Sequence, residues 1–495
     1  MTTSSPGTSR GAASLAELEA QFRRDCELLL VPPQKAWLEP RNHPTHGAML
    51  DVAIIGAGMA GLVAALALKR LGITRVAIFD RSAAGLEGPW LSYARMQVLR
   101  SPPELVGPAL GFPSLTFRAW YEAQFGSAAW SDLHRIPRVQ WMAYLDWYRR
   151  MVGVPIENDC EMTSIDGGHD HVVLSLRTSA GTRRVAARRV ILANGRDGLG
   201  GAFVPSVFRH LSVARCAHSS DAIDFSSLAG RTVGVIGAGA SAVDNAAEAL
   251  EHGAAHVALL VRRGQVPRIN RGMGIGSPGM YHGFYQLAPE QRWAIVQFIA
   301  DHAIPPPRDS MLRCSRHPNF AVITDCDPRS AHEDGARVLL DTSRGMLGFD
   351  FLILATGFSV DWAQRPELGN IARHIVLWRD RFQPTDGQPF EQGNYPFLGP
   401  ALEFLEREPG AAPWVERVHC DAFPAFLSHG PLTGDIPAIS VGAERIAQGI
   451  AAKLFCEDFD RNWQKLLSFD TPELRGDEFT PADDITVFLA KGDDQ

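Results

Sequence analysis

Two glycine-rich segments of this 495-residue chain have the residue types and the spacing that suit close contact with a phosphate group. The first contains Gly56, Gly58, Met59, Ala60 and Gly61, and the second contains Gly237, Gly239, Ala240, Ser241 and Ala242. Glycine permits a tight turn and lets backbone amides approach a pyrophosphate, and a helix that follows directs its positive end towards the phosphates. We therefore predict a dinucleotide site at each segment, called here the first glycine segment (56–61) and the second glycine segment (237–242).

The residues that close the two sites carry opposite charges. Asp80 lies 24 residues after Gly56, whereas Arg262 lies 25 residues after Gly237 and is followed by Arg263. A carboxylate accepts hydrogen bonds from a free ribose 2′-hydroxyl and repels a 2′-phosphate, which guanidinium groups bind with charge-assisted hydrogen bonds. We therefore expect a permanently bound FAD at the first segment and NADPH at the second. A solvated strand end is the alternative interpretation of the two arginines.

Each segment must lie between a strand and a helix, with a second strand after the helix. Hydrophobic patterns predict this unit twice, at residues 51–80 and 231–262. The charge-free run 52–68 approaches the length of a membrane span, but its glycines favour a strand, a turn and a buried helix. Repetition of the unit predicts an α/β fold with two Rossmann-like dinucleotide-binding domains, the NADPH domain inserted into the FAD domain.

The domain boundaries follow from where these units fall in the chain. We predict an N-terminal extension with one helix at 1–49, the first part of the FAD domain at 50–215, the NADPH domain at 216–335, the second part of the FAD domain at 336–460, and a C-terminal tail at 461–495. Within the first part, Trp141, Tyr144 and Tyr148 have helical spacing, and we interpret them as a face that packs on the core rather than as a substrate cage.

Three further segments complete a recognisable order along the chain. They are Gly88-Pro89-Trp90 after the first unit, Ala355-Thr356-Gly357 at the end of a predicted strand, and Gly434-Asp435-Ile436-Pro437 before the last predicted helix. Together with the two glycine segments, they resemble the class B flavoprotein monooxygenases over about residues 50–455. The resemblance implies cofactor contacts from Trp90, Ala355, Thr356, Gly357, Asp435 and Ile436, and we assign Arg81, beside Asp80, to the same cofactor site.

The resemblance also implies the chemistry. In this family NADPH reduces FAD, O₂ adds to the reduced flavin as a C4a-hydroperoxide, and one oxygen atom passes to a nucleophilic small molecule. We favour an amine nitrogen as the acceptor, because the H-x-x-x-W-P ending of Baeyer–Villiger enzymes is absent. S-oxygenation and Baeyer–Villiger oxidation stay open, as do an NADPH-dependent flavin reductase or oxidase and a flavoprotein that senses NADP(H) without catalysis.

Two residues are the catalytic candidates. Arg100 stands where flavin-containing members of the family carry an asparagine near the flavin, so that role cannot be copied to this chain. Asn270 follows the second unit, within reach of a nicotinamide or an acidic substrate. Arg95 is a candidate contact for a cofactor phosphate or the flavin edge, with a surface role as the alternative.

The composition argues against several other classes of protein. The 48 Lys and Arg residues against 55 Asp and Glu give a net charge of −7, so nucleic acid is not an expected partner. Seven scattered cysteines without a C-x-x-C pair, and histidines without metal-ligand spacing, argue against a dithiol centre and a metal site. Without a signal peptide, we expect a cytoplasmic enzyme that acts on a small molecule and O₂, away from membranes. Dimers are common in the family, so a homo-oligomer is expected as well.

Overall fold

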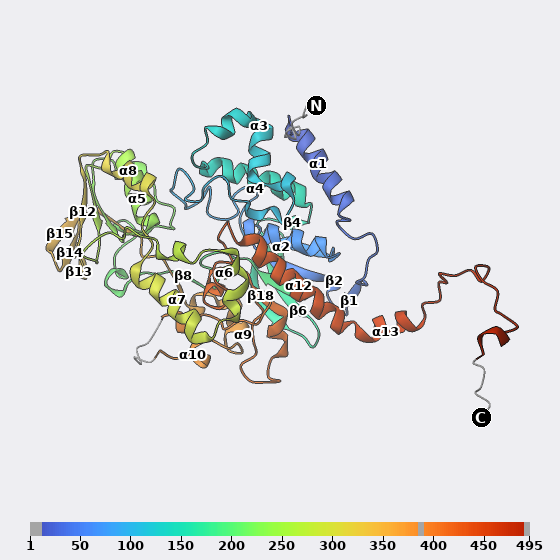
Figure 1. The fold of residues 1–495 in the computed structure, drawn as a ribbon. Coiled ribbons are helices and arrows are strands. Elements are labelled where there is room, and N and C mark those ends of the chain that lie inside the picture. Colours follow the sequence, from blue (N-terminus) through green and yellow to red (C-terminus); the bar gives the residue numbers. More distant parts are fainter. Residues whose placement is uncertain (1–11, 385–390, 490–495) are drawn as a thin grey trace, which may run out of the picture. The chain divides into compact units, whose positions relative to one another are not determined.

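The computed structural model describes residues 12–384 and 391–489 (Figure 1). Internal contacts divide the chain into two units, Met1–Ile450 and Ala451–Gln495. The first unit contains both glycine segments and every sheet that the structure describes.

The first glycine segment leaves the carboxyl end of β2 (Gly47–Ile55), inside an eight-stranded mixed sheet. Helix α2 (Met59–Arg70) follows, and β3 (Val76–Phe79) returns parallel to β2. On the other side of β2 lies β7 (Gly181–Leu192), also parallel, and the late strand β18 (Val418–Cys420) runs parallel to β7. The carboxyl ends of these four strands therefore form one edge, which is where open α/β sheets bind their ligands.

The second glycine segment occupies the same place in a separate five-stranded sheet. Strand β10 (Thr232–Ile236), helix α5 (Ala240–Glu251) and β11 (His256–Leu260) form the predicted unit. The strand order is β12-β11-β10-β16-β9, and all these neighbours are parallel. The outer strands are β9 (Cys216–His218), β12 (Phe320–Ile323) and β16 (Phe351–Leu354). Two parallel units of this kind confirm the predicted fold class.

Strand pairing shows where the chain passes between the two sheets. The predicted boundary at 335/336 falls in the turn between two paired antiparallel strands, β13 (Pro328–Asp334) and β14 (Arg337–Thr342), and β16 beyond them still belongs to the second sheet. The chain crosses between the sheets at β8 (Gly200–Ala202) and β17 (Phe358–Val360), which pair antiparallel. The hydrophobic pattern of a short strand does not show which sheet it joins, and the domain limits themselves stay predictions.

Helix α4 (Arg138–Val152) confirms the core interpretation of its aromatic stripe. Trp141, Tyr144 and Tyr148 are at most 1% exposed. The Tyr144 hydroxyl donates to the Leu115 carbonyl oxygen, and the Tyr148 hydroxyl to that of Pro108, both at 2.7 Å. All three rings therefore pack within the core, and they are not available to enclose a substrate.

The other elements complete the first unit (Figure 1). The helices are α1 (Leu15–Leu28), α3 (Phe117–Ser131), α6 (Pro278–Gly283), α7 (Pro289–His302), α8 (Arg308–Ser315), α9 (Gly369–Ala372), α10 (Trp378–Arg381), α11 (Phe426–His429) and α12 (Ile439–Glu457), which runs into the second unit. The strands are β1 (Arg41–His43), β4 (Ile156–Glu157), β5 (Glu161–Gly167), β6 (Val172–Thr178) and β15 (Gly345–Phe349).

The second unit contains one further α-helix, α13 (Phe459–Leu467). The tail predicted from residue 461 therefore starts inside a helix, whose apolar residues Phe459, Trp463 and Leu466 are exposed. Among the described residues, no helix combines the length and the apolar character that crossing a membrane requires.

Candidate active site

Three of the predicted glycines are required by packing within the chain. Gly56 has a φ of +109°, and a Cβ there would lie 2.3 Å from the carbonyl oxygen of Ala193, just beyond β7. A Cβ on Gly61 would lie 1.9 Å from the carbonyl oxygen of Gly56. Gly237 repeats the first case, with a φ of +130° and 2.6 Å to the carbonyl oxygen of Ala355. These glycines let each turn approach the neighbouring strand.

Gly58 and Gly239 have no such reason to be glycine. Their φ values are −70° and −86°, which any residue adopts. Within the described chain, the nearest atom to a Cβ on Gly58 would be the Gly88 Cα at 4.0 Å, and nothing lies within 4 Å of one on Gly239. Each residue begins a helix, α2 or α5, without a side-chain cap. Open space at the positive end of a helix fits a phosphate, so both segments fit a dinucleotide.

Asp80 lies directly beyond β3, where the first site needs its carboxylate. Its side chain accepts hydrogen bonds from the backbone N–H groups of Ala57 and Ser82, both at 2.7 Å, and is 8% exposed. These bonds hold the carboxylate beside the first glycine segment. Arg81 turns instead towards the loop after β7, where it lies 3.5 Å from Asp197.

Asp421 is a buried acid at this sheet edge that the sequence analysis missed. It directly follows β18, its N–H donates to the carbonyl oxygen of Leu192 at 2.9 Å, and it is 2% exposed. Neither carboxylate oxygen has a hydrogen-bond partner in the part of the chain that the structure describes, and burial raises its pKa to about 7. A buried carboxyl without a partner is destabilising, so this position fits a ligand that supplies donors, such as the hydroxyl groups of FAD.

The two arginines of the second site have different surroundings. Arg262 is exposed, and it has no hydrogen-bond or ion-pair partner among the described residues. Arg263 donates to the carbonyl oxygens of Asp301 and Ala300, at the carboxyl end of α7. A positive charge at a helix C-terminus is favourable, so Arg263 has a structural role in α7, and Arg262 is the better placed contact for a 2′-phosphate.

The loop after β3 contacts both the first domain and the inserted domain. The Trp90 ring packs edge-on against Trp141, with 6.1 Å between the ring centres. Arg95 donates to the carbonyl oxygen of Asp221 at 3.1 Å, and its guanidinium lies 5.5 Å from the Phe225 ring centre. Arg100 donates to the carbonyl oxygen of Pro305 at 2.6 Å. Arg95 and Arg100 therefore both bind to the inserted domain.

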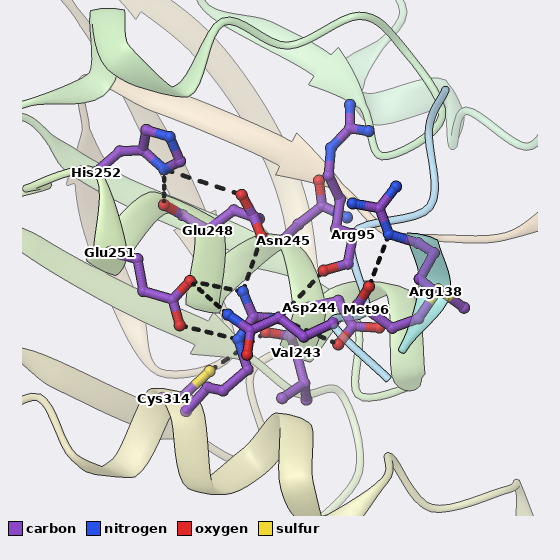
Figure 2. A network of polar contacts seen from close by, with 12 residues as sticks. Arg95, Met96, Arg138, Val243, Asp244, Asn245, Glu248, Glu251, His252 and Cys314 are labelled. Atoms are coloured by element: carbon purple, nitrogen blue, oxygen red, sulfur yellow. Dashed lines mark hydrogen bonds and ion pairs between the residues drawn. The ribbon is translucent and has the colours of Figure 1, made fainter. Parts of the chain in front are cut away.

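Arg313 of α8 also binds this loop, through a network of polar contacts whose members Arg95, Asp244, Glu248 and Glu251 are labelled in Figure 2. Its guanidinium donates to Glu248 at 2.8 Å, to Glu251 at 2.7 Å, and to the carbonyl oxygen of Arg95 at 3.1 Å. Asp244 lies 3.8 Å from the same guanidinium, and burial raises the pKa of Asp244 to about 6. The network joins α5, which starts at the second glycine segment, to the loop of the first domain. Sequence reasoning missed Arg313, because these partners meet only in the fold.

The remaining predicted residues lie at the crossing and at two turns. The Thr356 hydroxyl and the Gly357 carbonyl oxygen both bond to the backbone of Phe203, which holds the two crossing strands together. Asp435 and Ile436 lie in the turn before α12. Asn270 precedes a short helical turn, its side chain caps nothing there, and no described contact joins it to Arg100.

Comparison with known proteins places this site in a family. A family model described as pyridine nucleotide-disulphide oxidoreductase matches residues 53–272. An FAD-dependent urate hydroxylase from Xanthomonas campestris pv. campestris is 37% identical over 466 residues, which cover 94% of this chain and 98% of that protein. The chain belongs to the class B flavin-dependent monooxygenases.

Solved structures of flavin-dependent monooxygenases share the fold at low sequence identity. The ornithine N-hydroxylase of Kutzneria sp. 744 is 17% identical and covers 82% of this chain and 99% of its own, with a TM-score of 0.61. The L-lysine 6-monooxygenase of Pseudomonas syringae is also 17% identical and covers 81% and 99%, with a TM-score of 0.63. The protein is a flavin-dependent monooxygenase, as predicted. All seven of its cysteines are free in the structure.

Proposed function

We propose that this monooxygenase hydroxylates urate or a closely related oxidised purine, with FAD at the first glycine segment, NADPH at the second and O₂ as co-substrate. The observation that carries the proposal is the 37% identity to the FAD-dependent urate hydroxylase, which spans 94% of this chain. The reaction balances when the substrate, O₂, NADPH and a proton give the hydroxylated product, NADP⁺ and water.

The protein's own residues bind and orient the cofactors. When bound, FAD supplies the oxygen chemistry, and the protein positions it and excludes water. The first turn of α2 would hold the pyrophosphate of FAD, Asp80 would accept from its ribose, and Asp421 would accept from a cofactor hydroxyl. Arg262 would select the 2′-phosphate of NADPH.

Arg100 remains the proposed catalytic contact, together with Asn270. Burial lowers the pKa of Arg100, and the charges of Asp244 and Asp435 oppose this shift. Asn270 has no described contact that supports or excludes the role. A cytoplasmic location and a homo-oligomeric state also stay predictions from the sequence.

Amine N-hydroxylation is the second candidate. Asp435 is a solvent-accessible carboxyl beside Arg100, and a carboxylate would suit an ammonium substrate. Partial desolvation raises the pKa of the Asp435 carboxyl, and the positive charges of Arg196 and Arg100 lower it. Two arginines against one carboxyl favour an anion over an ammonium group at this place.

Substrate-dependent turnover of the FAD-loaded protein tests the proposal. NADPH oxidation and O₂ uptake would be followed with urate, with ornithine, with lysine and with no substrate, and peroxide would be assayed in parallel. Urate should stimulate NADPH oxidation and yield a product that carries one atom of ¹⁸O from ¹⁸O₂. Stimulation by an amine alone would favour N-hydroxylation, and peroxide release unchanged by all three compounds would overturn both proposals.

A further inference from the structure

Arg196 and Phe423 lie together at the carboxyl edge of the first sheet. Arg196 comes four residues after β7 and Phe423 three residues after β18, and these strands run parallel with Leu192 opposite Cys420. The N–H of Phe423 donates to the carbonyl oxygen of Gly195 at 3.4 Å, which ties the two loops together. Although 226 residues separate them in the sequence, they leave the same edge as the first glycine segment.

The guanidinium of Arg196 is held in place without being neutralised. Its Cζ lies 4.6 Å from the centre of the Phe423 ring, and that ring stacks on Phe426. Such a cation–π contact orients the guanidinium but leaves its N–H donors free. The adjacent Asp197 pairs with Arg81 and Arg365 instead, and no carboxylate within the described ranges forms an ion pair with Arg196.

The charge of this guanidinium acts on groups from three segments that are distant in the sequence. Burial raises the pKa of Tyr93 and of Asp435, and it raises the pKa of Tyr395 to about 12. The positive charge of Arg196 lowers each of these three pKa values. Tyr93 comes from the loop after β3, Tyr395 precedes β18, and Asp435 lies in the predicted flavin turn. Arg196 itself is exposed, so its charge is accessible to a solute at the edge of the first sheet.

We propose that Arg196, held on the ring of Phe423, binds the anionic edge of a planar purine substrate and so sets substrate specificity. This inference rests on the proposed function. Urate is an anion at neutral pH, and its neighbouring carbonyl oxygens and ring nitrogens accept the paired N–H donors that a planar guanidinium presents. A lysine side chain at position 196 would supply the charge but not the paired donors. A positively charged substrate, such as free ornithine or lysine, would be repelled by Arg196.

Urate binding to the oxidised, FAD-loaded enzyme tests the proposal without turnover. The dissociation constant would be measured from the change in flavin absorbance, for the wild type and for Arg196→Gln and Arg196→Lys. We expect Arg196→Gln to weaken urate binding about thirtyfold and Arg196→Lys about tenfold, with unchanged FAD content. In turnover, KM for urate should rise with the dissociation constant while kcat changes less than KM.

A matched control separates this site from a general loss of charge or of a cation–π pair. Arg118 of α3 is also exposed and lies 5.2 Å from the Trp130 ring centre, although it also pairs with Glu122 at 2.9 Å. Arg118→Gln therefore removes a charge and a cation–π contact elsewhere, and it should leave urate binding unchanged. Equal urate binding by wild type and Arg196→Gln would overturn the proposal, and so would loss of FAD from that variant. Equal binding by Arg196→Lys would refute the paired-donor geometry. If the wild type itself neither binds nor oxidises urate, the proposed function fails instead.

Discussion

Replacing Asp421 with asparagine tests whether the edge of the first sheet is built around a ligand. In the protein alone, burial raises the pKa of this carboxyl from 3.8 to about 7, because neither oxygen has a described partner. Below pH 4 both the folded and the unfolded chain hold the proton, so the group has no net effect on stability. Between pH 4 and pH 7 only the unfolded chain loses the proton, and the folded state is therefore destabilised as pH rises.

The size of this effect follows from the difference in pKa. At about 1.4 kcal/mol per pKa unit, a rise from 3.8 to about 7 lowers the free energy of unfolding by about 4 kcal/mol once the pH exceeds 7. Asparagine has nearly the same shape and does not ionise. The flavin-free Asp421→Asn variant should thus match the wild type at pH 4 and exceed its stability at pH 8 by up to about 4 kcal/mol. The same variant should bind FAD more weakly, by about tenfold or more, if the carboxylate accepts from a cofactor hydroxyl.

Urea unfolding of the flavin-free proteins, followed by far-UV circular dichroism from pH 4 to pH 8, measures the first effect. Fluorescence titration with FAD measures the second. Asp51→Asn is the control with the opposite sign, because Asp51 is buried but pairs with Arg75 at 2.8 Å, and its loss should destabilise the protein at neutral pH. A stability difference between Asp421→Asn and wild type that does not vary with pH would refute the reasoning, as would unchanged FAD affinity.

Four further substitutions test the cofactor sites. Gly58→Val should give a folded but colourless protein, because its side chain would fill the open space where a phosphate would lie. Gly61→Ala should instead impair folding, because its Cβ would clash with the backbone. A yellow Gly58→Val protein would show that FAD is assigned to the wrong segment. Arg262→Ala should raise KM for NADPH about thirtyfold, because a contact with the 2′-phosphate is worth roughly 2 kcal/mol. KM for NADH should stay nearly unchanged, and an equal rise in both KM values would exclude the 2′-phosphate contact. Arg313→Met should slow flavin reduction in stopped-flow measurements without loss of FAD, because it frees the loop at Arg95 from α5; an unchanged reduction rate would exclude a positioning role.

The sequence determined the local units of the fold. A strand, a glycine turn, a helix and a second strand leave signals within about 30 residues, so both dinucleotide units were predicted with nearly their observed limits. The acid after β3 and the arginines after β11 were readable for the same reason. The helical spacing of Trp141, Tyr144 and Tyr148 likewise identified a core face.

The sequence did not show which sheet a short strand joins. The three-residue strands β8 and β17 pair where the chain passes between the sheets, and their patterns are too short to distinguish one sheet from another. The predicted boundary at 335/336 therefore divided two strands that pair. Pairing depends on contacts between segments about 150 residues apart, which local periodicity does not record.

Only the tertiary structure separated residues of the same type by role. Arg262 and Arg263 are adjacent, yet Arg262 has no partner in the described part of the chain, whereas Arg263 donates to a carbonyl oxygen at the end of α7. Asp421 and Arg196 belong to no motif, and they gain their significance because β18 and β7 end side by side at the edge that carries the first glycine segment. Burial and charge environment are properties of the assembled fold, so the chain's motifs predicted the cofactor sites, and only long-range packing showed which other side chains lie at the same sheet edge.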